Sequence, residues 1–176
     1  MLLLAVLSTA LAPSSGGAPA QRDPVVGGAV MSASRPLLEN AAAAANLSTL
    51  TSTVKTAGLT DTLNGPGPFT VFEPTNEAFA KLPYGTLDRL EKDALARILT
   101  YHVVPGKLSS RDLVRMIRRT NGKAVLKTLQ GEEITATMMG ERVVLTDAKG
   151  GMALITTPDV YQSNGVAHIV DTVLLP

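Results

Sequence analysis

The 176-residue chain has no cysteine and no tryptophan, and it has only two histidines. The absence of cysteine excludes disulfides, thiolate metal sites and cysteine nucleophiles. Aromatic residues amount to 3% of the chain, so stacking platforms for bases or sugar rings would have to come from three Phe and three Tyr, which weakens nucleic-acid and lectin interpretations. Any acid–base chemistry based on histidine would have to use His102 or His168.

A strong net charge is also lacking, because 16 basic residues nearly balance 15 acidic residues and leave a formal charge of +1. Long-range electrostatic attraction is therefore weak, and any electrostatic function must be local. Hydrophobic residues make up 45% of the chain and charged residues 18%, a composition typical of a folded protein. The length predicts a single domain.

The beginning of the chain has the character of a secretion signal. Residues 1–11 are uncharged, nearly all apolar and too few to span a bilayer, and Ala18-Pro19-Ala20 resembles a cleavage site. We expect residues 1–20 to be a signal peptide, 21–34 a lead-in or linker, and 35–176 the folded domain. The mature protein is then secreted, periplasmic or at the cell surface, and it has no transmembrane segment.

Hydrophobic spacing and turn residues divide the domain into a helical first part and a strand-rich second part. Helices are predicted over residues 36–45, 47–57, 75–82, 93–102 (capped by Asp93) and 109–117. Strands are predicted at 25–26 and 69–72, in an antiparallel meander with turns at glycines 122, 131, 140 and 150, and in a last pair at 166–170 and 173–175. This order indicates an α+β fold.

Catalytic sequence patterns are absent: there is no phosphate-binding P-loop, no G-x-S-x-G elbow and no H-E-x-x-H zinc helix. His102 lies on the apolar side of its predicted helix. His168 alternates with Val166 and Val170 on one face of a strand. Both placements predict interior histidines with satisfied hydrogen bonds. We therefore expect no catalytic residue, no metal site, no cofactor and no enzymatic activity.

Positive charge is concentrated between residues 107 and 127, where seven basic residues accompany one acidic residue. Four of them have the spacing i, i+4, i+7, i+8 and form one helical stripe: Arg111, Arg115, Arg118 and Arg119. Such a stripe can bind phosphate, anionic polysaccharide or anionic lipid. A solvated helix face that binds nothing is the alternative.

Three stretches taken together resemble the fasciclin-like domain: FTVFEPTNEAF at residues 69–79, YHVV at 101–104 and NGVAHIVDTVL at 164–174. The similarity is greatest to single-domain bacterial secreted members. It implies a single-domain α+β wedge, in which helices pack against a sheet rich in antiparallel pairs. It also implies a non-enzymatic role in adhesion at cell surfaces or in matrix. The partner would be a surface or matrix protein or a polysaccharide, and not a nucleic acid.

The resemblance also implies contact residues. In animal relatives, integrin contact has been assigned to a tyrosine–histidine pair, which Tyr101 and His102 match, and to an aspartate–aliphatic motif, which Asp159 and Val160 match. An exposed carboxylate can complete the coordination of a metal ion held by a partner. The alternative interpretation is structural: Tyr101 and His102 belong to the core, and Asp159 forms a turn.

Two residues depart from the family pattern, and one of them is Ala167, which replaces a larger aliphatic residue near the final strand. Glu73 stands where a small apolar residue is usual, so we expect its charge to reach solvent or find a partner. The leading hypothesis is an exported adhesion module that performs no chemistry. The alternative is a module that binds an anionic glycan or a small ligand on the arginine stripe.

Overall fold

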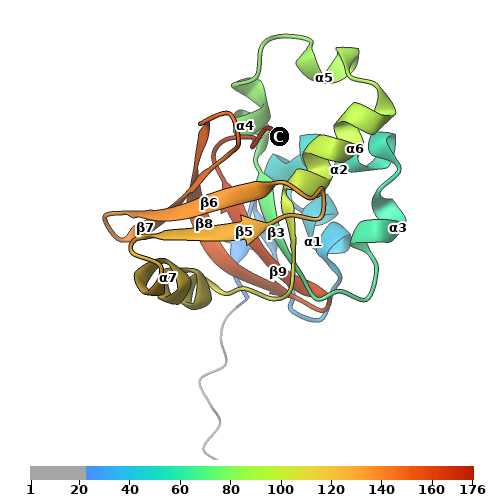
Figure 1. Ribbon diagram of the computed structural model, residues 1–176. Helices are drawn as coiled ribbons and strands as arrows, with labels where there is room; N and C mark the ends of the chain where they lie inside the picture. The colour runs from blue at the N-terminus through green and yellow to red at the C-terminus, as the bar shows by residue number, and fades with distance from the viewer. Residues whose placement is uncertain (1–22) are drawn as a thin grey trace, which may run out of the picture.

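A seven-stranded mixed sheet organises residues 23–176, the part of the chain that the computed structural model describes (Figure 1). The expected signal peptide lies outside these residues. The strands of the sheet are β3 (Phe69–Pro74), β4 (Val103–Pro105), β5 (Lys123–Lys127), β6 (Glu133–Met139), β7 (Arg142–Thr146), β8 (Met152–Gln162) and β9 (Gly165–Val170). Their order across the sheet is β4-β3-β9-β8-β7-β6-β5.

The strands from β5 to β9 pair antiparallel with their neighbours in sequence, which confirms the predicted meander. β3 and β9 pair in parallel, from Phe69 opposite Gly165 to Pro74 opposite Val170. The prediction of a last strand at 173–175 is wrong. The amides of Leu174 and Leu175 donate to the side chains of His102 and Asp147, so this segment is held by side chains and forms no ladder.

Helices connect the early strands and precede the meander. They are α1 (Leu37–Ala43), the 3₁₀ turn η1 (Ala45–Leu47), α2 (Ser48–Ala57), α3 (Thr60–Leu63), α4 (Asn76–Ala80), α5 (Thr86–Arg89), α6 (Lys92–Tyr101) and α7 (Ser110–Arg119). All five predicted helices form, and η1, α3 and α5 are additional. Gly58 ends α2 in the left-handed conformation, and the Thr75 hydroxyl accepts a hydrogen bond from the amide of Ala78 at the start of α4.

The predicted cap of α6 is wrong. The helix begins at Lys92, and Glu91 occupies the capping position with an extended backbone and no side-chain cap. Asp93 therefore lies within the first turn, where a carboxylate still interacts favourably with the helix dipole.

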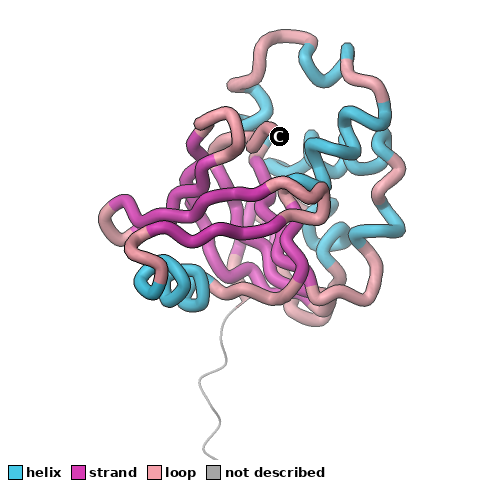
Figure 2. Tube along the Cα trace, in the orientation of Figure 1, coloured by secondary structure: helices cyan, strands magenta, loops and turns pink. Residues whose placement is uncertain are grey.

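Two apolar cores hold the elements together. In the first, Leu50, Val54 and Leu99 pack with residues of β3 and β9, so the core lies between these strands and the helices before β4. In the second, Leu113 and Ile117 of α7 pack on the meander. Figure 2 shows α7 set apart beneath the meander, while the other helices gather at the opposite side. This is the single-domain α+β architecture that the sequence predicts.

A short hairpin of β1 (Val25–Val26) and β2 (Ala29–Val30) precedes α1. Val26 and the following Met31 are buried in the first core. The described part of the lead-in segment thus packs on the domain and does not hang free as a linker. No helix within residues 23–176 has the length and apolar character needed to cross a membrane.

Candidate functional site

The His102 imidazole lies in the interior and is fixed in one tautomer. Its Nε2 accepts a hydrogen bond from the Leu174 amide at 3.0 Å, so Nε2 carries no proton. Nδ1 therefore holds the proton and donates it to the Ile98 carbonyl at 2.8 Å. Burial lowers the pKa of His102 to about 4, against the opposing effect of that carbonyl. The ring is neutral near pH 7 and joins α6 to the C-terminal segment.

The second imidazole is held in the same manner. The Asp159 amide donates to His168 Nδ1 at 3.2 Å, which leaves Nε2–H to donate to the Leu108 carbonyl at 2.8 Å. The ring stacks on Phe72 with 5.8 Å between centroids. Burial lowers the pKa of His168 as well. Both histidines are interior with satisfied hydrogen bonds, as the sequence predicts.

The Tyr101 side chain is fully buried beside His102. Its hydroxyl donates to the Glu133 carbonyl at 2.8 Å and accepts from the Ala148 amide at 3.0 Å, which ties the end of α6 to the meander. Neither Tyr101 nor His102 presents side-chain surface to a partner in this structure.

Asp159 lies in an irregular stretch of β8, where the pairing with β9 shifts between Thr157 and Val160. Its backbone has a φ of 59°, in the left-handed region that aspartate tolerates. Its half-buried carboxylate accepts hydrogen bonds from the Ser110 amide at 2.7 Å and from the Ser110 hydroxyl. Val160 is fully buried. Asp159 is thus the only one of the four predicted contact residues that reaches the surface.

The structure does not bring these four residues together into one site. Within residues 23–176 no hydrogen bond joins Tyr101 or His102 to Asp159. Asp159 lies instead at the first turn of α7, where it fixes the helix to β8.

The predicted arginine stripe is exposed along α7. Arg111, Arg115, Arg118 and Arg119, together with Ser110 and Val114, line a shallow groove of about 460 Å³. Arg115 lies 3.4 Å from an Asp112 carboxylate oxygen. For the other three guanidinium groups, the described part of the chain provides no carboxylate within 4.0 Å.

The sequence-based expectation for Glu73 is wrong. This residue of β3 is 1% exposed, and its Oε1 has no hydrogen-bond partner within the described residues. Burial raises the pKa of the Glu73 carboxyl to about 8. The side chain therefore avoids an unpaired buried charge by remaining protonated near neutral pH.

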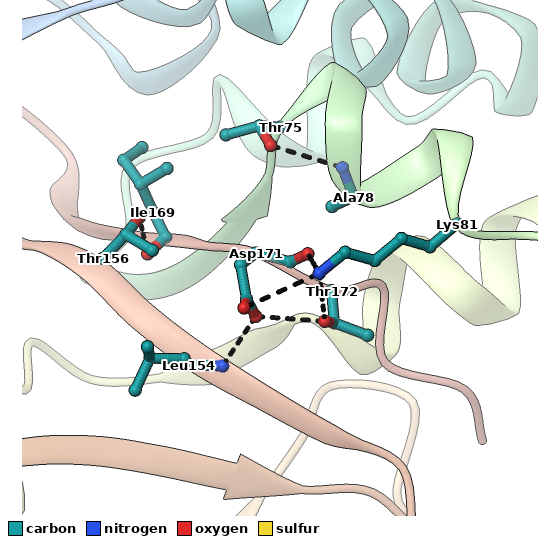
Figure 3. Close-up of polar contacts among 8 residues, drawn as sticks. All are labelled: Thr75, Ala78, Lys81, Leu154, Thr156, Ile169, Asp171 and Thr172. Atoms are coloured by element: carbon teal, nitrogen blue, oxygen red, sulfur yellow. Dashed lines mark hydrogen bonds and ion pairs between the residues drawn. The ribbon is translucent and has the colours of Figure 1, made fainter.

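A polar bracket around Lys81 was not predicted from the sequence (Figure 3). The Lys81 ammonium donates to the Asp171 carbonyl at 2.6 Å and to the Thr172 hydroxyl at 3.2 Å, and it lies 3.6 Å from the Asp171 carboxylate. That carboxylate accepts a hydrogen bond from the Leu154 amide of β8 at 2.8 Å. The bracket joins the end of α4 to the segment after β9. Asp171 belongs to a quoted family stretch, whereas nothing in the sequence marked Lys81.

No cluster of three or more acidic or histidine side chains that could hold a metal ion occurs in the part of the chain that the structure describes. The two imidazoles have both nitrogens engaged, and the buried carboxyl of Glu73 faces an apolar core. Among the site residues predicted from the sequence, those accessible to other molecules are the half-exposed Asp159 carboxylate and the arginines on the outward face of α7.

Known proteins provide an independent comparison. A family model described as the fasciclin domain matches residues 45–176. Protein sll1483 of Synechocystis is 39% identical over 160 residues, covering 89% of this chain and 82% of that protein. Cell surface glycolipoprotein MPB83 of Mycobacterium bovis is 41% identical over 137 residues, covering 74% of this chain and 56% of that protein.

The solved FAS1 domain pair of the insect cell adhesion molecule fasciclin I has the same fold. It superimposes with a TM-score of 0.69 at 22% identity, covering 81% of this chain and 51% of that one. The family match spans well over half of the chain, and a relative of similar length is more than one third identical. The chain therefore belongs to the fasciclin domain family, whose members are non-enzymatic adhesion proteins.

Proposed function

We propose that this chain is an exported adhesion module that recognises a protein or a polymer at a cell surface or in matrix. The observation that best supports the proposal is that the imidazoles of His102 and His168 are buried and hydrogen-bonded in the interior. Both are neutral and have both nitrogens hydrogen-bonded, so recognition through the exterior is the activity that the described side chains can support. The proposed location is secreted, periplasmic or at the cell surface.

The relatives support the same class of activity. MPB83 is described as a cell surface glycolipoprotein, and fasciclin I is described as a cell adhesion molecule. This chain spans about half the length of each of these two proteins. Their location and role are therefore arguments for a domain of this kind and not for a particular partner.

Asp159 is the proposed point of contact among the four residues that match the family motifs. Its carboxylate is half-exposed, and a carboxylate has room for a further interaction beyond two accepted hydrogen bonds, including a metal ion held by the partner. Tyr101, His102 and Val160 are buried and support the fold from the interior.

Adhesion is tested by coating a surface with the purified chain and measuring the retention of cells or matrix. We expect retention above that on an inert protein of similar net charge, because recognition depends on specific groups and not on the formal charge of +1. Retention equal to that of the inert protein would refute the proposed function.

The role of Asp159 is tested by recovering surface components with the wild-type, Asp159→Ala and Ser110→Ala proteins. Ser110→Ala removes the hydroxyl donor to Asp159 but leaves both the carboxylate and the backbone hydrogen bond in place. We expect recovery to fall with Asp159→Ala and to persist with Ser110→Ala. Equal recovery with all three proteins would remove Asp159 from the contact surface.

A further inference from the structure

The outward face of α7 carries positive charge that the protein itself does not neutralise. Asp112, the acidic residue of this helix, is engaged elsewhere: its carboxylate accepts hydrogen bonds from the amide and the hydroxyl of Ser109 in a capping box. It lies near Arg115, but Arg111, Arg118 and Arg119 have no carboxylate within 4.0 Å among residues 23–176. Three guanidinium groups are thus available to an external anion.

The cationic face continues beyond the start of the helix. The Lys107 ammonium lies 4.9 Å from the centroid of the Tyr161 ring. Burial and the charges of Asp159 and Asp112 raise the pKa of the Tyr161 hydroxyl, and the charge of Arg111 opposes them. Lys107 is exposed and precedes Arg111 by four residues, so it adds a basic group just before α7.

The dimensions of the row indicate an extended ligand. Arg119 follows Arg111 by eight positions, and at about 1.5 Å per residue the two lie about 12 Å apart along the helix axis. A single small anion can contact only part of such a row. A chain of anionic groups can contact all of it, because guanidinium groups bind carboxylates and sulfates through paired N–H donors.

We propose that the outward face of α7, with Lys107, is a docking surface for a linear anionic polysaccharide. The inference rests on the proposed adhesion function and names the partner class. Sulfate or carboxylate groups of the polymer lie along the four arginines, and Val114 between them contacts the apolar faces of the sugar rings.

A membrane surface fits these observations less well. Amphipathic helices bind membranes by inserting an apolar face, whereas the apolar face of α7 is buried on the meander through Leu113 and Ile117. The exposed side offers only Val114 for insertion. A nucleic acid also fits less well, because the residues that line the groove include no aromatic side chain to stack with bases.

The test compares two variants that each remove two positive charges. Arg111→Gln/Arg118→Gln changes exposed, unpaired residues of the row. Lys123→Gln/Lys127→Gln changes exposed residues of β5 that point away from the sheet face covered by α7. Calorimetric titration with heparin and with polygalacturonate, at about 50 and about 200 mM salt, measures affinity and its salt dependence. Circular dichroism checks that both variants are folded.

We expect the wild-type chain and the lysine variant to bind both glycans. The arginine variant should bind at least about tenfold more weakly, with a salt slope reduced by about two. Equal weakening by both variants would show non-specific charge attraction and overturn the proposal. Binding to phosphatidylglycerol vesicles as tight as binding to the glycans would also overturn it, because the surface would then serve a membrane.

Failure of this inference can be distinguished from failure of the adhesion function. If the wild-type chain retains cells and the arginine variant retains them equally well, the adhesion function stands and the docking surface is refuted. If glycan binding is lost in the arginine variant but the wild-type chain retains no cells, the docking surface stands and the adhesion function is refuted.

Discussion

Glu73 is the residue whose burial has the clearest consequence for stability. It lies two positions after Val71 on β3, so both side chains project from the same face of the sheet into the helix-covered core. Burial raises the pKa of its carboxyl from 4.5 to about 8. The folded protein therefore holds a proton that the unfolded chain releases at a lower pH.

The first prediction concerns the pH dependence caused by Glu73. Between pH 4.5 and about 8 Glu73 binds more protons in the folded state than in the unfolded state, so its contribution to the free energy of unfolding decreases as pH rises. The decrease is about 1.4 kcal/mol per pH unit. Glu73→Gln cannot ionise and removes this dependence. Its melting temperature relative to wild type should therefore increase from about pH 5 to about pH 8.

A matched control is Glu141→Gln, which changes an exposed carboxylate in the turn between β6 and β7. Its melting temperature should follow the wild-type curve at every pH. Parallel curves for wild type and Glu73→Gln would show that Glu73 ionises in the folded protein without penalty.

The sequence identified Glu73 as unusual but could not show where its side chain goes. Because side chains alternate along a strand, Glu73 and Val71 must share one face of β3, but the sequence does not show which face of the sheet the helices cover. That depends on the packing of α2 and α6 and on the parallel pairing with β9, which lies nearly 100 residues further along the chain. The bracket between Lys81 and Asp171 could not be predicted from the sequence for the same reason, because these residues are also far apart in the chain.

At the scale of elements, local patterns predicted α7 well. Its start is marked by Ser109, whose hydroxyl accepts from the Asp112 amide while the Asp112 carboxylate accepts from the Ser109 amide. This capping box is readable from residue types alone. The attachment of α7 to β8 through Ser110 and Asp159 was not readable, because it joins segments 49 residues apart.

The second prediction is that Ser109→Ala lowers the free energy of unfolding by about 1 kcal/mol, the usual effect of losing a helix cap. The amide of Asp112 loses its acceptor, and the Asp112 carboxylate loses the hydroxyl donor. Urea unfolding measures the change. Ser52→Ala is the control, because Ser52 is exposed inside α2, where alanine is the better helix former. A loss of stability in the control equal to that of Ser109→Ala would contradict the capping assignment.

Helices and strands were thus predicted where the sequence repeats a local pattern. They were missed where the structure depends on contacts between segments that are distant in sequence. Helical spacing revealed α1, α2, α4, α6 and α7, and glycine turns revealed the meander. The parallel pair β3–β9 and the irregular C-terminal segment depend on contacts with residues far away in sequence. For the candidate site, exposure of the arginine stripe followed from its spacing, whereas burial of Tyr101 and Val160 required the folded structure.

At the scale of the whole molecule, the buried titratable groups act in opposite directions. Glu73 favours folding at low pH. His102 and His168 favour folding at high pH: their pKa values are lowered by burial, so the unfolded chain takes up protons first as pH falls. The window for His102 extends from 6.5 down to about 4. Glu73 and His102 oppose each other between pH 4.5 and 6.5, and the lowered pKa of His168 adds to the effect of His102.

The third prediction is a bell-shaped stability profile with its maximum near pH 6.5, the ordinary pKa of histidine. Below the maximum, the two histidines outweigh Glu73 and stability falls with acid. Above it, the histidines are neutral in both states, and Glu73 alone lowers stability up to about pH 8. Urea unfolding across this range measures the profile. In Glu73→Gln the alkaline decline should disappear while the acid decline remains and steepens, because the opposing carboxyl is gone. A wild-type protein whose stability keeps rising from pH 6.5 to 8 would show that Glu73 is not the protonated, buried group that the structure indicates.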